Sequence, residues 1–164
     1  MSAYITLLTP MLDEECLLAA LADRGFDRTK VEVHATPVAL VGYADDARGQ
    51  TANLVIRRKY VGAASNDIGF QSTPTGYRVL VSDYDRSRFG PDWLASLTDR
   101  YQQHSAAKQE RLDAEERRRL EDARQKLVEA QRAAVHEKAK KMGYQVKETR
   151  EGDTIRLVLI KRSY

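Results

Sequence analysis

The side chains that could perform chemistry in this chain are few and widely spaced. Its three histidines, His34, His104 and His136, lie far apart in the sequence, and Cys16 is its single cysteine. A metal site needs several such ligands close together, and a catalytic cysteine needs a base held beside its thiol. The sequence therefore predicts no metal site and no cofactor, and we interpret Cys16 as a small buried packing residue.

Carboxylates in loops are the remaining candidates for catalysis. Asp45-Asp46 and Asp83-Tyr84-Asp85 form small acidic clusters, and turn formation explains such clusters without a reaction. The chain lacks a glycine-rich phosphate loop before a helix, and it lacks a serine nucleophile elbow. No catalytic residue is assigned, and an enzyme that uses loop carboxylates, including Asp67, is kept as a third alternative.

The excess of positive charge is concentrated in one segment. The 164 residues include 27 basic and 24 acidic side chains, which give a formal net charge of +3. Residues 107–141 hold 11 of the basic and 8 of the acidic side chains, and the rest of the chain holds 16 of each. Because both signs are mixed within residues 107–141, the charge gives only weak support to nucleic-acid binding.

Strand patterns occur on both sides of this charged segment. Before it, we expect a helix over residues 14–24 that starts after the N-cap Asp13, and strands within residues 4–8, 31–43, 50–61, 67–70 and 76–82. After it, residues 144–150 and 154–162 flank a Glu-Gly-Asp turn, which predicts a hairpin. The expected fold is α+β, with an antiparallel sheet of five to seven strands and two helices packed on one face.

Two features mark possible sheet edges. Pro37 lies within the second expected strand, where it indicates a bend or an edge position. Arg57-Arg58-Lys59 puts positive charge on both faces of a strand end. We interpret these cations as a guard against edge-to-edge pairing, with a contact surface as the alternative.

A long helix should join the two strand-rich parts. Gly90-Pro91-Asp92 is a good helix start, and neither Gly nor Pro occurs again before Gly143. A continuous helix of this length would measure about 75 Å, more than the width of the domain. We therefore expect a single domain over residues 1–164, in which residues 107–141 form a helical projection or coiled-coil arm.

The arm carries a thin apolar pattern that would suit a partner helix. Val128, Val135 and Met142 recur every seven residues. Beside them, five residues follow the alternating spacing of three and four that is typical of a coiled-coil seam: Leu120, Ala123, Leu127, Ala130 and Ala134.

Two other interpretations of the arm stay open. Acid–base pairs four residues apart, such as Asp122 with Lys126 and Glu137 with Lys141, would stabilise a solvated helix or a helix that folds back on itself. Basic clusters would suit nucleic acid, and the residues concerned are Arg117, Arg118, Arg119, Lys138, Lys140 and Lys141.

No membrane or export signal is evident. No apolar run approaches the roughly 20 residues that a membrane-spanning helix needs. The N-terminal residues lack the basic start and apolar stretch of a signal peptide. We therefore expect a cytoplasmic protein without membrane contact.

Several short motifs, taken in order, resemble a known family. They are Arg48-Gly49-Gln50, Asn66-Asp67-Ile68-Gly69-Phe70, Trp93, Arg100-Tyr101 with His104, and Gly143-Tyr144. Together they resemble a small conserved family of unassigned function, found as a plastid reading frame in red algae and also in cyanobacteria and other bacteria. This chain differs by about thirty additional residues between His104 and Gly143.

The resemblance carries no catalytic residues, but it implies a class of partner. Some members are encoded near ring-forming ATPases of the remodelling kind, which implies an accessory role beside such a motor. Together with the seam, this predicts a non-catalytic adaptor that binds a protein partner, such as a ring-forming ATPase or a second copy, through its arm. The alternative is a nucleic-acid-associated accessory factor that uses the basic clusters of the long helix.

Overall fold

The computed structural model describes residues 3–161, apart from the side chains of residues 47 and 48. Arg162, the expected end of the last strand, lies outside the described residues, as does the side chain of Arg48 from the first family-like motif. The chain divides into two compact units, Met1–Glu110 and Arg111–Tyr164. Helix α4 (Pro91–Lys141) contributes to both units.

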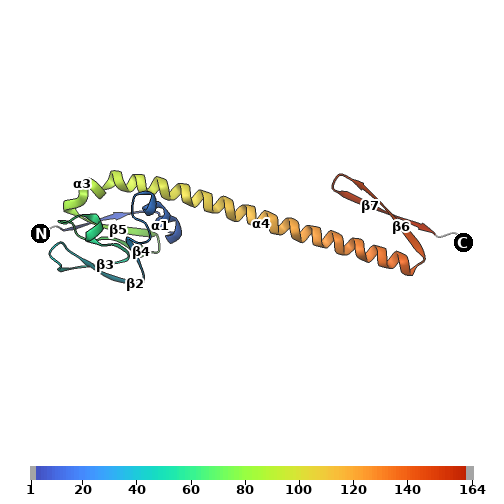
Figure 1. Ribbon diagram of the computed structural model, residues 1–164, viewed down its shortest axis with the longest axis horizontal. Helices are drawn as coiled ribbons and strands as arrows, with labels where there is room; N and C mark the ends of the chain where they lie inside the picture. The colour runs from blue at the N-terminus through green and yellow to red at the C-terminus, as the bar shows by residue number, and fades with distance from the viewer. Residues whose placement is uncertain (1–2, 162–164) are drawn as a thin grey trace. The chain divides into compact units, whose positions relative to one another are not determined.

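The first unit is built on a five-stranded antiparallel sheet with the strand order β1-β5-β4-β3-β2 (Figure 1). The predicted α+β class and antiparallel sheet are confirmed. Consecutive strands from β2 to β5 form a meander, and β1 pairs with β5, so the first strand of the chain forms one edge. The strands are β1 (Tyr4–Leu8), β2 (Val31–Val41), β3 (Ala47–Ile56), β4 (Ile68–Thr73) and β5 (Gly76–Ser82).

Helix α1 (Glu14–Asp23) starts and stops on local signals. The Asp13 carboxylate accepts a hydrogen bond from the backbone N–H of Cys16 at 3.0 Å, which satisfies one donor of the first turn. After the last turn, Gly25 takes a left-handed φ of 89°, a conformation that glycine adopts without steric cost. Cys16 itself is buried, as its neighbours in the sequence suggest.

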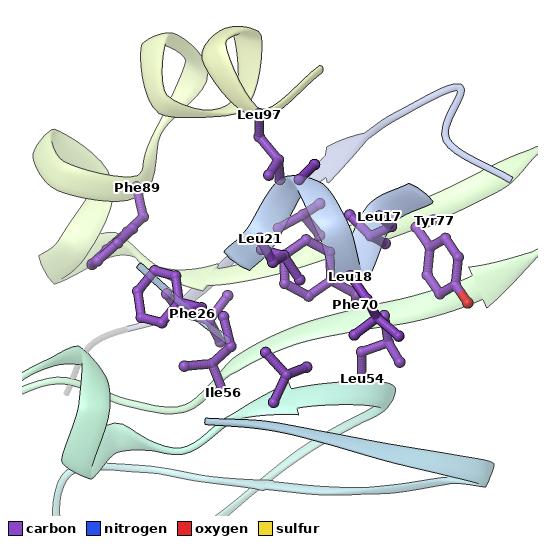
Figure 2. Close-up of a cluster of buried hydrophobic side chains, with 14 of the residues drawn as sticks. Leu17, Leu18, Leu21, Phe26, Leu54, Ile56, Phe70, Tyr77, Phe89 and Leu97 are labelled. Carbon is purple, nitrogen blue, oxygen red and sulfur yellow. The ribbon is translucent and has the colours of Figure 1, made fainter. Parts of the chain in front are cut away.

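The main core lies between one face of the sheet and the helices α1 and α4 (Figure 2). On its helical side, Phe89 packs edge-on against Trp93 with ring centroids 5.3 Å apart. Both predicted helices therefore cover the same face of the sheet. Residues with no exposed surface, or almost none, include Leu17, Leu21, Leu54, Ile56, Phe70 and Leu97.

The prediction of a guarded edge at Arg57-Arg58-Lys59 is wrong. Strand β3 ends at Ile56 and lies between β2 and β4, so it is not an edge strand. The chain then turns into the short helix α2 (Arg58–Val61). The edge strand beside β3 is β2, and its register with β3 shifts between Val33 and Val38, the interval that contains Pro37.

Helix α4 is continuous from Pro91 to Lys141, which excludes the fold-back alternative. Two short helices, η1 (Asp83–Asp85) and α3 (Arg86–Phe89), lead into it. Gly143 follows with a left-handed φ of 77°, as expected for the residue after a helix end. None of the helices in residues 3–161 is long and apolar enough to cross a membrane.

The second unit contains the end of α4 and the predicted C-terminal hairpin, which is confirmed. Strands β6 (Tyr144–Glu151) and β7 (Thr154–Lys161) pair along their full length. Gly152, with a φ of 59°, takes the first position of the two-residue turn. Among the described residues, no third strand joins this sheet. Because an isolated two-stranded hairpin is marginally stable, it depends on α4 for support.

Candidate functional site

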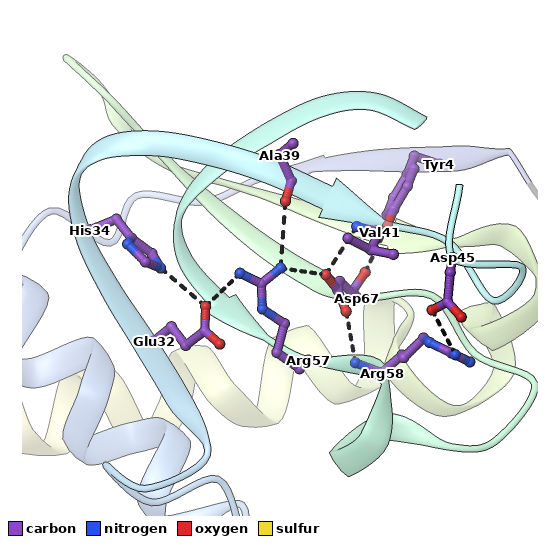
Figure 3. Close-up of polar contacts among 9 residues, drawn as sticks. All are labelled: Tyr4, Glu32, His34, Ala39, Val41, Asp45, Arg57, Arg58 and Asp67. Carbon is purple, nitrogen blue, oxygen red and sulfur yellow. Dashed lines mark hydrogen bonds and ion pairs between the residues drawn. The ribbon is translucent and has the colours of Figure 1, made fainter. Parts of the chain in front are cut away.

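A cluster of charged groups joins four strands of the first sheet (Figure 3). The carboxylate of Asp67, whose side chain is 1% exposed, accepts hydrogen bonds from the backbone N–H groups of Val41 at 3.0 Å and Arg58 at 2.7 Å. It also accepts one from the Arg57 guanidinium at 2.9 Å. The Tyr4 hydroxyl donates to the Asp67 carbonyl at 3.0 Å. A single residue before β4 therefore connects β1, β2 and the end of β3.

Arg57 extends this cluster towards the solvent. Its guanidinium donates to the Glu32 carboxylate at 2.6 Å, and the Nε2 atom of His34 lies 3.1 Å from the same carboxylate. The Arg57 guanidinium lowers the pKa of Glu32 to about 2, and the Glu32 and Asp67 carboxylates raise the pKa of Arg57. Each acid in the cluster is paired with a base. Because these pairs join residues from different strands, the cluster holds the strands of the sheet together.

Two of the loop acids and the three histidines are engaged in separate pairs, and Asp45 pairs with Arg58. Asp85 is buried and accepts a hydrogen bond from the Ser65 hydroxyl at 2.8 Å. Within residues 3–161, no group of three or more His, Cys, Asp or Glu side chains could hold a metal ion. Instead, each histidine contacts a different carboxylate, in the pairs His34–Glu32, His104–Asp23 and His136–Glu148.

In the second unit, the hairpin packs against one side of α4 through a charged contact. Glu148 on β6 accepts a hydrogen bond from Nε of Arg132 at 2.6 Å, and it also contacts His136. Further along the helix, a polar groove of about 470 Å³ lies between α4 and the turn of the hairpin. Its helical wall includes Glu121, Val128 and Glu129.

The Glu148 contact predicts a specific acid titration. Arg132, and then His136, lower the pKa of Glu148 to about 2 from an ordinary value near 4.5. A lowered pKa in the folded state means that the carboxylate stabilises the docked hairpin above pH 4.5 and loses this contribution as the pH falls towards 2. We expect carboxyl NMR to give a Glu148 midpoint near pH 2.

The Arg132→Gln variant is the control for this titration. Removing the guanidinium should move the Glu148 midpoint up towards its ordinary value. A midpoint near 4.5 in the parent protein would mean that the hairpin does not hold this contact in solution.

The five predicted seam residues lie on the opposite side of α4 from the hairpin. Successive residues of a helix are about 100° apart, which places the seam roughly 150° from the groove-lining residues. Leu120 and Leu127 are each 60% exposed, and the three alanines, Ala123, Ala130 and Ala134, are exposed as well. None of the five lines the groove, whereas Val128, from the neighbouring apolar row, does. The hairpin thus lies on the Val128 side of α4, where Val128 is still 40% exposed, and it leaves the seam uncovered.

Helix geometry spreads the basic candidates around α4. Arg117, Arg118 and Arg119 are consecutive, so they point in three directions about 100° apart. Lys138, Lys140 and Lys141 are spread in the same way, and Lys141 pairs with Glu137 at 3.1 Å. These six residues therefore do not form one continuous basic side.

Sequence reasoning missed the two contacts that organise the units. Arg57 is ten residues from Asp67, and Arg132 is sixteen residues from Glu148. Neither separation matches a helical or strand repeat, so no local pattern marks these pairs. One signal was available for the first contact: Asn66 and Asp67 lie immediately before a strand, and such residues often bind nearby backbone groups.

Comparisons with known proteins find no match: no family model, no curated protein and no solved structure is similar to this chain. The assignment of a function therefore depends on the residues and their geometry.

Proposed function

We propose that the chain is a non-catalytic adaptor that binds a protein partner through the seam on α4, Leu120, Ala123, Leu127, Ala130 and Ala134. The observation that carries this proposal is the exposure of the stripe on the side of α4 that the hairpin does not cover. A helix normally buries its apolar stripe, and an exposed stripe at coiled-coil spacing is typical of helix-to-helix recognition.

The residues of the family-like motifs make contacts that hold the fold together. A Cβ atom on Gly69 would lie 2.7 Å from Cβ of Ala52 and 2.7 Å from Cδ1 of Leu40, so glycine is required for close packing. The Tyr101 hydroxyl accepts hydrogen bonds from the backbone N–H groups of Leu12 and Asp13. On these residues we propose membership of the plastid and bacterial family, with the additional residues lengthening α4.

The resemblance suggests which partner to test first. We propose a ring-forming ATPase of the remodelling kind, with this chain as its accessory protein. The nucleic-acid alternative has less support, because its basic residues are spread around the helix. A protein partner and a nucleic-acid partner would behave differently in one capture experiment.

The test compares capture from native lysate by the parent chain and by the Leu120→Glu, Leu127→Glu double variant. We expect the double variant to lose the partner, because two leucine contacts would be lost and two carboxylates would enter the apolar contact. Its thermal unfolding should match the parent's, since both positions are exposed. Quantitative mass spectrometry of the captured proteins measures the loss.

A matched control places two new glutamates on the other side of the helix. Ala107→Glu with Ala114→Glu introduces two carboxylates, also seven residues apart, at exposed positions away from the seam. This control should retain the partner. Retention by the Leu120→Glu, Leu127→Glu variant would overturn the seam as the binding surface, and recovery that depends on nuclease-sensitive material would favour the nucleic-acid alternative.

A further inference from the structure

The charges beside the seam indicate what kind of helix can cover it. With Leu120 and Leu127 at the a positions of a heptad, the flanking e and g positions are those that contact the flanks of a partner helix. On one flank lie Arg117 and Arg124, and on the other lie Arg119 and Lys126. The remaining flanking residues, Gln131 and Ala133, are neutral. The seam therefore has cations on both sides and no acid on either.

The acids of the same stretch lie elsewhere on α4. Glu121 and Glu129 line the groove beside the hairpin, on the side away from the seam. Among the described residues, Lys126 has no ion pair with Asp122, although the sequence spacing allows one. Arg124 lies 3.9 Å from Glu121, but both side chains are more than half exposed, and such a pair is weak. Arg124 also lines the groove beside the hairpin, whereas Arg117, Arg119 and Lys126 do not. All four cations are exposed, so they can reach a partner helix.

A second copy of this chain fits the seam poorly. In a parallel pair, g contacts e of the partner helix, which would place Arg119 against Arg124 of the other copy. In an antiparallel pair, e contacts e and g contacts g, so cations would meet cations or neutral residues. Like charges at these positions destabilise the pair and select against it.

We infer that the seam binds an acidic amphipathic helix of another protein, with Leu or Ile along its contact stripe and Glu or Asp on both flanks. This inference rests on the proposed function and specifies its partner. Three of the five seam residues are alanines, which leave shallow holes on α4. Large apolar side chains of the partner fill such holes, and its flanking carboxylates face the four cations.

The test uses two synthetic helical peptides that differ only in charge. Both have three heptads with Leu at a and d; one carries Glu at every e and g position, and the other carries Lys. Fluorescence anisotropy with the full chain at low salt should give binding about tenfold tighter for the Glu peptide, as four weak ion pairs would supply. High salt should reduce the difference in affinity between the two peptides. In a sedimentation experiment without peptide, the chain should be a monomer.

Charge reversal on α4 provides the decisive control. Replacing Arg117, Arg119, Arg124 and Lys126 by Glu should reverse the preference, so that the Lys peptide binds more tightly. Equal binding of both peptides by the parent, no reversal in this variant, or no binding of either peptide at millimolar concentration would overturn the acidic partner. A dimer of the chain that depends on Leu120 and Leu127 would also overturn the acidic partner, because a second copy of the chain would then cover the seam.

A charge-neutral variant separates this inference from the proposed function. Leu120→Ala with Leu127→Ala removes apolar surface and leaves every charge in place. We expect it to weaken binding of the Glu peptide at least tenfold, since two leucine contacts are lost. Unchanged binding by this variant would overturn the seam as the binding surface, and with it the proposed function. Failure of charge selectivity alone would overturn only the acidic partner.

Discussion

Replacing Asp67 by Ala should lower the free energy of unfolding of the first unit by about 3 to 5 kcal/mol. The substitution leaves the partly buried Arg57 guanidinium without its innermost partner. It also leaves the backbone N–H groups of Val41 and Arg58 without acceptors. Trp93 is the single tryptophan of the chain and is buried in this unit, so its fluorescence during urea unfolding measures the loss.

Two variants control for this effect. Asp67→Asn preserves the shape of the side chain and one acceptor oxygen. It should therefore lower the free energy of unfolding by less than Asp67→Ala does. Asp45→Asn removes the charge of the exposed ion pair with Arg58, whose atoms lie 2.7 Å apart, and keeps a side chain that tolerates the left-handed φ of 57° at this position. It should cost less than about 1 kcal/mol. A loss below about 1 kcal/mol for Asp67→Ala would contradict the role of this residue as the brace of four strands.

Replacing Leu54 by Ala should destabilise the first unit by about 2 to 5 kcal/mol. Leu54 lies on the interior strand β3, has no exposed surface and belongs to the main core (Figure 2). Its truncation removes buried methyl groups and leaves a cavity that the sheet can only partly close. The measurement is again urea unfolding followed by Trp93 fluorescence.

The same substitution at an exposed leucine is the matched control. Leu8 also lies on a strand of this sheet, but it is 76% exposed, so Leu8→Ala should change the free energy of unfolding by no more than about 0.5 kcal/mol. If the two variants were equally stable, Leu54 would not lie in a packed core.

Several parts of the fold could be predicted from the sequence because their causes are local. Asp13 caps a helix because its carboxylate reaches a backbone N–H three residues away. Gly90-Pro91 starts a helix, and Gly143 ends one, because of their own backbone preferences. Gly152 turns a hairpin for the same reason. Each of these signals acts over a few residues, so the sequence contains the whole cause.

The candidate seam was only partly predictable. Helical periodicity places Leu120 and Leu127 in one row and Val128 in a neighbouring row. Periodicity does not say on which side of α4 the hairpin lies, because both rows are apolar and similarly spaced. That choice depends on the contact between Glu148 and Arg132, two residues that meet only after the chain has turned at Gly143.

The sequence by itself determined the longer elements, with their type and approximate ends, and the apolar stripe of the long helix, because these follow from steric and hydrogen-bonding preferences within one or two turns. It did not show the short helix α2, which lies within the expected strand 50–61. Only the tertiary structure decided that β1 pairs with β5, that β3 lies inside the sheet, and that Arg57 binds Asp67 instead of guarding an edge. These features depend on contacts between segments far apart in the chain. Such contacts form through pairing and burial across the whole sheet, which no local pattern encodes.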